Sequence, residues 1–493
     1  MKIVVVGGGT AGWLAALMIS KIKPENTVTV IESSKIGIIG AGEGSTGSLT
    51  NIIHNEMWDF GCNEQDFIKE CDATIKLGIK HIGWGPDKNK HYYGPIDGTP
   101  TSNDVVDLVF QHALGCRDQD LLHIATELGY KIHHNKNSFV EPAGNHAYHF
   151  DAHKVGQYFK KICESVTHID SEVEQVMLES DTGFVESVKL SNGNTVEGDM
   201  FIDASGFNQV LMKAVGGKWK SYKDNLPVNS ALPFLLPYED DEVIQPVTNA
   251  WAQNNGWCWQ IPTKNRRGCG YVFSDEFVTA DQAHAELEQT IGRKVDPIRL
   301  LKFESGRQET LWIKNVLSIG LCAAFAEPLE ATSIHTTIMQ LKDFVFSCLS
   351  TNRDITCNEG TVNKYNNDKA HMYDTTRDFL VAHYTCGRND TEFWKYIDSG
   401  ATTTEFVKSI HEVCKHRVPN MTLFPRPEGG AGWPLWSYVL AGTGKLTSEV
   451  AERELNFNND IDFSDSAYRY HVEVFDQRIQ NLPDNTQYIK GMK

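Results

Sequence analysis

The fold is decided by the stretch KIVVVGGGTAG at residues 2–12. Residues 3–6 form a continuous β-branched run, which is the pattern of a strand buried on both faces of a sheet. The run breaks directly into three glycines, and the sequence WLAALMIS at residues 13–20 then favours a helix. Glycines here permit a tight turn and close approach of the backbone to a ligand, and the helix start presents free N–H groups to negative charge.

A second expected strand, TVTVI at residues 27–31, ends at Glu32, twenty residues after Gly12. Strand, glycine turn, helix and strand together are typical of a dinucleotide-binding unit, in which an acidic residue meets a ribose hydroxyl. The alternative is a secretory signal peptide, because Lys2 precedes an apolar run. Three glycines inside that run, and no convincing small-residue cleavage site, argue against it. We therefore expect an α/β fold.

Composition and charge narrow the class of protein. The chain has 493 residues, of which 41% are apolar and 22% charged, as in an ordinary globular protein. Its net charge of −18 argues against a nucleic-acid partner, which needs a basic face. Eleven scattered cysteines without a C-x-x-C pair suit reduced thiols in the cytoplasm and give no metal site. No apolar run reaches the length of a membrane span, and a homo-oligomer is left open.

The remaining nucleotide-related segments are dispersed along the chain. A glycine-rich loop covers residues 40–47, and strands are expected near residues 171–178, 185–190, 199–203 and 316–320. Apolar residues from Ile334 onward repeat at helical spacing. We expect a discontinuous nucleotide-binding domain with inserted substrate-side segments over residues 1–350, and a mainly helical lobe over residues 351–493.

Two further patterns can each be interpreted as purely structural or as part of a functional site. If the sequence WCWQIP at residues 257–262 forms a strand, the indoles of Trp257 and Trp259 lie on one face of it. The two rings could form the wall of a binding site, or they could simply be part of the hydrophobic core. Thr332 and Ser333 stand at the expected helix start, where free N–H groups could bind a small anion or either side chain could simply cap the helix.

Taken together, four motifs resemble those of the flavin-dependent halogenases of the tryptophan-halogenase family. They are GGGTAG at 7–12, the lysine of ATIKLGI at 73–79, WxWxIP at 257–262 and PLExT at 328–332. The resemblance covers most of residues 1–395. It implies an FAD-binding GxGxxG fold of the glutathione-reductase type, with a mainly helical second lobe.

The resemblance also implies roles for single residues. The FAD-binding set would be Gly7, Gly9, Thr10, Ala11, Gly12, Glu32, Glu43, Gly44, Val173, Leu321 and Ile334. Thr332 and Ser333 would bind the halide ion through backbone amides. Trp257 and Trp259 would separate the organic substrate from the flavin, while Lys76 and Glu330 would be catalytic.

The implied chemistry accounts for the two catalytic residue types. Reduced FAD, oxygen and halide would give hypohalous acid, and Lys76 could hydrogen-bond that acid or form a haloamine. Glu330 could take the proton that the aromatic ring loses. Without the other motifs, the simpler interpretation of Lys76 would be a solvent-exposed lysine, and that of Glu330 a surface acid in a salt bridge. No second nucleotide-binding segment for NADH is visible, so a separate reductase is expected to supply the reduced flavin.

The chain departs from the family pattern at two places. Ala331 and Ser333 stand where the family usually has serine and glycine, and a side chain at 333 restricts the backbone and favours bromide or iodide over chloride. Gly94 and Ile96 stand at the positions of a histidine and a phenylalanine that sandwich free tryptophan. We therefore expect a different electron-rich aromatic small molecule as substrate.

Two rival functions remain open. An FAD-dependent aromatic monooxygenase shares the glycine turn, but such enzymes usually carry Gly-Asp where this chain has Gly320 and Leu321, and they lack the tryptophan pair. A non-catalytic flavoprotein is the other rival, and the presence of both Lys76 and Glu330 argues against it.

Overall fold

The structure is a computed structural model that describes residues 1–37, 42–96, 146–418, 430–447, 449–450, 453 and 485–491. The start of the glycine-rich loop, at residues 40 and 41, and Cys116 lie outside these ranges. The chain divides into two compact units. The first comprises Met1–Ala73, Phe150–Tyr222 and Glu304–Asp374, and the second comprises Thr74–His149, Lys223–Phe303 and Thr375–Lys493.

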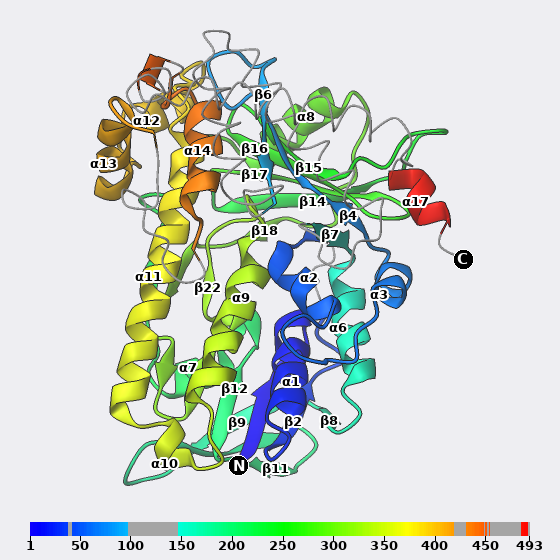
Figure 1. The fold of residues 1–493 in the computed structure, drawn as a ribbon, viewed down its shortest axis with the longest axis vertical. Coiled ribbons are helices and arrows are strands. Elements are labelled where there is room, and N and C mark those ends of the chain that lie inside the picture. Colours follow the sequence, from blue (N-terminus) through cyan, green and yellow to red (C-terminus); the bar gives the residue numbers. More distant parts are fainter. Residues whose placement is uncertain are drawn as a thin grey trace. The chain divides into compact units, whose positions relative to one another are not determined.

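The first unit is built on a six-stranded sheet with the order β20-β21-β12-β1-β2-β8. Its strands β12, β2 and β8 are labelled in Figure 1. All neighbouring strands are parallel except β20 and β21. The strands of this sheet are β1 (Lys2–Val6), β2 (Thr27–Glu32), β8 (Thr167–Asp170), β12 (Met200–Asp203), β20 (Trp312–Ile313) and β21 (Val316–Ser318). The central strand β1 has four buried residues in succession, as expected for a strand covered on both faces. The predicted strands at 2–6 and 27–31 are confirmed.

Helices and two small antiparallel sheets complete this unit. Helix α1 packs against α6 and α9. The helices are α1 (Thr10–Ile22), α2 (Gly47–Ile53), α3 (Glu64–Glu70), α6 (Ala152–Ile162), α7 (Val210–Ala214), α9 (Thr332–Asp343) and α10 (Arg353–Thr356). One sheet joins β9 (Val173–Leu178), β10 (Val185–Leu190) and β11 (Thr195–Glu197), and the other joins β13 (Trp219–Ser221), β19 (Gly306–Gln308) and β22 (Ala324–Phe325). Short turns are η1 (Gly206–Asn208), η2 (Gly320–Cys322) and η3 (Phe344–Cys348).

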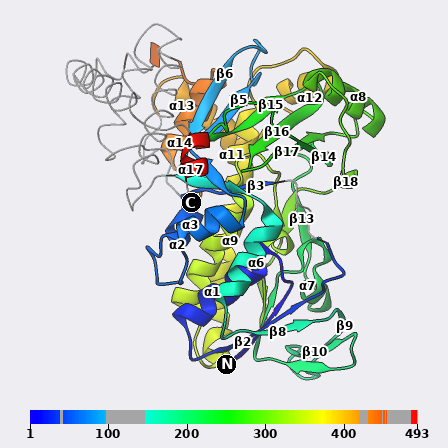
Figure 2. The ribbon, with the colours of Figure 1, turned by 90° about the vertical axis from the view of Figure 1, so that its right-hand side faces the viewer.

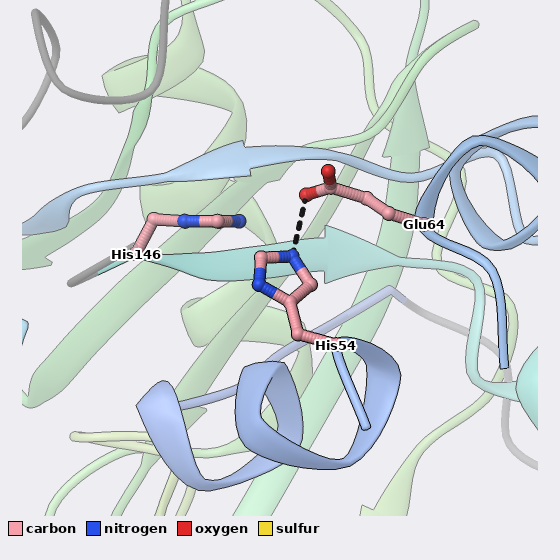
Figure 3. A group of neighbouring side chains, drawn as sticks. All are labelled: His54, Glu64 and His146. Carbon is pink, nitrogen blue, oxygen red and sulfur yellow. Dashed lines mark ion pairs between the residues drawn. The ribbon is translucent and has the colours of Figure 1, made fainter. Parts of the chain in front are cut away.

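Helices α2 and α3 are joined by an ion pair. His54 follows the last residue of α2, and Glu64 is the first residue of α3. The Nε2 atom of His54 lies 3.2 Å from Oε1 of Glu64, and the dashed line in Figure 3 marks this pair. Because α2 also packs against α9, this pair contributes to the position of the segment that follows the glycine-rich loop.

The second unit is built on a seven-stranded sheet with the order β18-β14-β17-β16-β15-β5-β6 (Figure 2). Its strands are β5 (Gly78–Ile82), β6 (His91–Pro95), β14 (Ser230–Leu236), β15 (Val247–Ala252), β16 (Gly256–Pro262), β17 (Arg267–Phe273) and β18 (Leu301–Lys302). Two further strands, β4 (Thr74–Lys76) and β7 (Ala147–Phe150), pair with each other. The helices are α8 (Ala280–Ile291), α12 (Glu392–Asp398), α13 (Glu405–Cys414), α14 (Trp433–Gly442) and α17 (Asn485–Gly491), together with the C-terminal part of α11 (Glu359–Tyr384).

The two faces of the seven-stranded sheet have different contents. One face carries Cys258, Tyr271 and Phe273, which form a core cluster with Ala283 and Leu287 of α8. The strand registers place Trp259 beside Ala250, and Ala250 beside His81, so these side chains share the opposite face. Trp257 is two residues from Trp259 and therefore lies on that face too.

The observed division differs from the expected one at residue 350. Residues 74–96 and 223–303 pair into the sheet of the second unit, whereas residues 351–374 belong to the first. The physical reason is that strand pairing joins segments that are far apart in sequence. A single boundary at one residue number therefore cannot separate the two units. Within the described ranges, no helix has the length and apolar character that crossing a membrane requires, and ten cysteines are free thiols.

Candidate active site

The glycine turn after β1 leaves little room for side chains, except at one position. Gly7 has a φ of +116°, and a Cβ atom there would lie 2.2 Å from the carbonyl oxygen of Ala204. A Cβ at Gly12 would lie 1.9 Å from the carbonyl oxygen of Gly7. A Cβ at Gly9, by contrast, would meet no atom within 4 Å. The chain is thus close-packed around the turn but open at Gly9.

The open position coincides with the start of α1. Gly9 is the N-cap residue of α1 and makes no side-chain cap hydrogen bond, and Thr10, Ala11 and Gly12 form the first turn. The first N–H groups of a helix have no partner within the helix and lie at its positive end. Open space above such N–H groups fits the pyrophosphate of a dinucleotide such as FAD.

Glu32 ends β2, as predicted, but its carboxylate has partners that the sequence did not indicate. Lys160 and His168 lie 2.5 and 2.8 Å from its Oε1 atom, and the indole nitrogen of Trp13 donates to Oε2 at 3.2 Å. Lys160 also lies over the Trp13 ring, 5.4 Å from its centroid. These contacts fix the side chain of Glu32 at the end of the strand.

Other predicted cofactor residues gather around this turn. A Cβ at Gly320 would lie 2.8 Å from the Cβ of Ala11, so η2, which contains Leu321, approaches the start of α1. The hydroxyl of Thr46 lies 3.0 Å from Nδ1 of His335, which joins the end of the glycine-rich loop to α9 beside Ile334. Val173, at the start of β9, packs against the core cluster that includes residues 6 and 31.

Glu43 and Gly44 form the short strand β3 (Glu43–Gly44). Gly44 is buried and Glu43 is half-buried. Burial raises the pKa of the Glu43 carboxyl to about 7, because removal from water disfavours the charged form. The side chain can therefore hold a proton near neutral pH, unlike an exposed glutamate.

The segment before α9 has an unusual backbone. Glu330 and Ala331 have φ values of +75° and +51°, in the left-handed region that residues with a Cβ seldom adopt. Ala331 is the N-cap residue and provides no side-chain cap. The N–H groups of the first turn, which begins at Thr332 and Ser333, therefore receive no hydrogen bond from an N-cap side chain. Strained backbone of this kind is enriched at active sites and ligand-binding segments.

The position of Ser333 corrects one part of the sequence argument. We expected a side chain there to restrict the backbone, but Ser333 is the second residue of α9 and its φ is not positive. The special φ values fall at Glu330 and Ala331 instead. The effect of serine in place of glycine at 333 therefore rests on its hydroxyl group and its volume.

Lys76, in the second unit, is almost fully buried, with 1% of its surface exposed. It ends β4, and two contacts anchor this strand within the same unit. The hydroxyl of Thr74 donates to the carbonyl oxygen of Pro262 at 2.5 Å, and Asn485 of α17 donates to the carbonyl oxygen of Ile75 at 3.2 Å. Because Pro262 ends the WCWQIP strand, the lysine strand is attached to the tryptophan strand.

The two tryptophans lie on one face of β16, as predicted. Trp257 and Trp259 are buried, and their ring centroids are 6.3 Å apart. Trp259 lies against Gly270, where a Cβ would meet the indole ring at 2.0 Å. Trp84 contacts Trp257 at 6.4 Å between centroids and was not predicted from the sequence.

Gly94, which differs from the family pattern, lies on the same face of the sheet as Trp257 and Trp259. It pairs with Ile79 in the register of β5 and β6, and a Cβ added at Gly94 would lie 3.6 Å from the His81 ring. His81 in turn stacks on Tyr92, with centroids 4.6 Å apart and planes inclined by 10°. An aromatic pair therefore stands beside Gly94.

Each unit thus holds a coherent part of the predicted site. The first unit brings together the glycine turn, Glu32, the glycine-rich loop, η2 and the start of α9 with Glu330. The second brings together Lys76, Trp257 and Trp259.

Comparisons with known proteins agree with this arrangement. The sequence matches the protein-family model described as tryptophan halogenase over residues 2–456. It is 31% identical to tryptophan 7-halogenase RebH of Lentzea aerocolonigenes over 430 residues, which cover 80% of this chain and 78% of that protein.

Solved structures give the same result. The structure of tryptophan 6-halogenase SttH from Streptomyces toxytricini superposes with a TM-score of 0.87 at 27% identity, over 99% of each chain. That of BrvH, a flavin-dependent halogenase from Brevundimonas sp. BAL3, superposes with a TM-score of 0.83 at 26% identity, also over 99% of each chain. This chain is therefore a flavin-dependent halogenase that belongs to the tryptophan halogenase family.

Proposed function

We propose that this enzyme halogenates an electron-rich aromatic small molecule other than free tryptophan, and that a separate reductase supplies its reduced FAD. The observation that supports the proposal most is the buried Lys76, on a strand attached through Thr74 to the WCWQIP strand. Burial of an amine costs free energy, and buried titratable groups of this kind cluster at functional sites. Reduced FAD, when bound, supplies the electrons with which oxygen converts halide into hypohalous acid.

Two groups of residues in the first unit would bind FAD and the halide ion. The open space at Gly9, the start of α1 and Glu32 would hold the adenosine-diphosphate half of FAD, with Glu43, Gly44, Val173, Leu321 and Ile334 around the rest. The first turn of α9, at Thr332 and Ser333, would bind the halide through backbone N–H groups.

In the transfer step, the ring carbon forms a bond to the halogen. The bond that breaks joins the halogen to oxygen when hypohalous acid reacts directly, and to the Lys76 nitrogen when a haloamine reacts, which returns the amine. Lys76 would donate a hydrogen bond to the oxygen of hypohalous acid or carry the halogen as a haloamine. The oxygen leaves as water when hypohalous acid reacts directly. Glu330 would accept the proton that the ring loses. Trp257 and Trp259 would exclude the organic substrate from the flavin.

The substrate class follows from Gly94. Relatives are named for tryptophan, but Gly94 provides no ring where the family pattern has a histidine, and the His81–Tyr92 stack stands beside it. Small phenols and indoles other than tryptophan are therefore the proposed substrates. We also assign the protein to the cytoplasm, because the ten cysteines in the described ranges are free thiols, which suit a reducing compartment.

The decisive experiment measures halide-dependent product formation with chemically reduced FAD, over a panel of phenols and indoles that includes tryptophan. We expect halogenated phenols or indoles and little halogenated tryptophan. Hydroxylated product that forms without halide would instead identify a monooxygenase. Halogenated tryptophan as the main product, or no product from any phenol or indole, would contradict the proposed substrate class.

The halide preference is the finer part of the proposal. Larger halide ions lose less hydration free energy on entering a pocket and are easier to oxidise, and the Ser333 hydroxyl adds volume at the start of α9. We expect bromide or iodide to be used in preference to chloride when all are present at equal concentration. The Ser333→Gly variant should recover part of the chlorination. Equal use of chloride by the unmodified enzyme would contradict this assignment.

A further inference from the structure

His149 shares a buried face with Lys76 in the second unit. Strands β4 and β7 are antiparallel, and Thr74 is paired with His149. Directly paired residues project to the same face, and Lys76 follows Thr74 by two residues, so all three side chains lie on one face. His149 is fully buried and Lys76 nearly so.

One nitrogen of His149 is held in place, and the other has no partner. Its Nε2 atom lies 2.8 Å from the hydroxyl oxygen of Thr248, which belongs to β15 of the large sheet. Its Nδ1 atom is buried and makes no hydrogen bond to any described residue. A buried polar atom without a partner is costly, so a partner that arrives during function would relieve that cost.

The charge state of the ring fits a cationic partner. Burial lowers the pKa of His149 well below its usual range, and the positive charge of Lys76 lowers this pKa further. The imidazole is therefore neutral and carries one N–H and one lone pair. With the cation nearby, the favoured tautomer has the N–H at Nε2, donating to Thr248, and the lone pair at Nδ1.

We propose that His149 is a positioning residue for Lys76, in which the Nδ1 lone pair accepts a hydrogen bond from the Lys76 ammonium group when the flexible lysine side chain turns toward it. A lysine stem has several rotatable bonds, and a fixed acceptor at its end reduces the number of positions that the amine samples. This contact would keep the amine on the face of the unit that it shares with Thr74 and His149. This assignment deepens the proposed function, because it takes Lys76 as the catalytic lysine.

The test measures the pKa of Lys76 by NMR in the full-length protein without flavin. Lysine labelled with ¹³C at Cε reports deprotonation of the amine, and the signal absent from the Lys76→Met variant identifies Lys76. Three variants separate the two nitrogens. His149→Asn places an oxygen near the position of Nδ1, His149→Gln keeps a group near Nε2 for Thr248, and His149→Phe removes both.

We expect the pKa of Lys76 to fall by about one pH unit or more in His149→Gln and His149→Phe, because the buried ammonium loses the acceptor that His149 offers. It should stay within a few tenths of the unmodified value in His149→Asn. The matched control is Thr263→Val, since Thr263 is also buried and its hydroxyl donates to the carbonyl oxygen of Arg266. If His149→Phe does not fold, His149→Gln still decides.

An unchanged Lys76 pKa in folded His149→Gln would overturn the proposal. A second readout compares reduced flavin consumed with halogenated product formed, and product per flavin should fall several-fold in His149→Gln but not in Thr263→Val. The NMR measurement needs no catalysis. Its failure is therefore distinguishable from failure of the proposed halogenation, which the product assay reports.

Discussion

Gly7 and Gly12 have no room for a Cβ atom, whereas Gly9 has open space around it. At the scale of single residues, the same sequence motif therefore contains glycines with two different functions. Gly7 and Gly12 permit the turn itself, through a positive φ and a close backbone contact. Gly9 leaves the turn unaffected and keeps space free above the helix start.

Replacement of Gly9 by valine should therefore weaken FAD binding strongly and leave the fold intact. Gly9 has a φ of −74° and a ψ of −175°, an extended conformation that valine adopts readily. We expect at least a tenfold weaker FAD affinity in a fluorescence titration, which corresponds to about 1.4 kcal/mol. The contrasting variant is Gly12→Ala, which should lower the free energy of unfolding by about 1–3 kcal/mol through overpacking. Undiminished FAD affinity in Gly9→Val would contradict the assignment of this space.

Lys76→Ala should separate flavin oxidation from halogen transfer. The variant should consume reduced flavin at nearly the normal rate, because the amine handles the oxidised halogen and not the flavin. Halogenated product should fall by about a hundredfold or more. Lys80→Ala is the matched control, because Lys80 pairs with Asn249 and lies on the other face of the sheet from Trp259. Normal product yield from Lys76→Ala would remove this residue from the mechanism.

The sequence identified these residues but not their surroundings. Lys76 and Glu330 were assigned through the resemblance alone, and nothing in the pattern around Lys76 showed that it is buried. The partners of Glu32 were also missed, because Lys160 and His168 are more than a hundred residues away in sequence. Side-chain contacts of this kind depend on tertiary packing, which local periodicity does not encode.

At the scale of elements, period-two alternation was sufficient to place the tryptophans. The WCWQIP strand was predicted, and β16 confirms both the strand and the shared face of Trp257 and Trp259. The support for this face was not predictable, since Gly270 belongs to the neighbouring strand β17. Only the register, which pairs Trp259 with Gly270, shows why that position has no side chain.

Gly270→Ala should displace the Trp259 ring. A Cβ at this position would lie 2.0 Å from the indole, so the ring must move or the strands must separate. We expect a loss of about 1–3 kcal/mol in the free energy of unfolding by urea titration, with a shift in tryptophan emission. The control is Gly94→Ala on the same sheet, where the added Cβ meets His81 at an ordinary 3.6 Å. Equal stability of the two variants would show that Trp259 does not rest on Gly270.

At the scale of the whole molecule, the chain passes between its two units several times. The sequence predicted a discontinuous nucleotide-binding domain, and it correctly predicted the strand and helix pattern at its start. It did not show which later segments return to which sheet. Parallel pairing of β5 with β15, for example, joins residues 78–82 to residues 247–251. Such pairing follows from the packing of the complete chain.

The two units should respond to acid in opposite directions. Glu43, in the first unit, has a pKa raised to about 7 by burial, so the folded unit binds its proton more tightly than the unfolded chain does. Its contribution to stability is present at low pH and is lost as pH rises through 7. His411, in the second unit, has a pKa lowered to about 4, first by burial and then by Lys445. Its unfolded form takes up a proton near pH 6.5, so its contribution is lost as pH falls from there toward 4.

Lowering the pH from 7.5 to 5.5 should therefore stabilise the first unit through Glu43 and destabilise the second through His411 and His149, whose pKa is also lowered by burial. Hydrogen exchange followed by mass spectrometry on peptides, corrected for the intrinsic pH dependence of exchange, measures both units in one sample. Protection of β1 and β2 should increase and protection of β16 and β17 should decrease. Glu43→Gln should suppress the first change alone, and His411→Gln should reduce the second alone. If both units lose protection together and neither variant alters its own unit, burial of these two groups does not set the acid response of the protein.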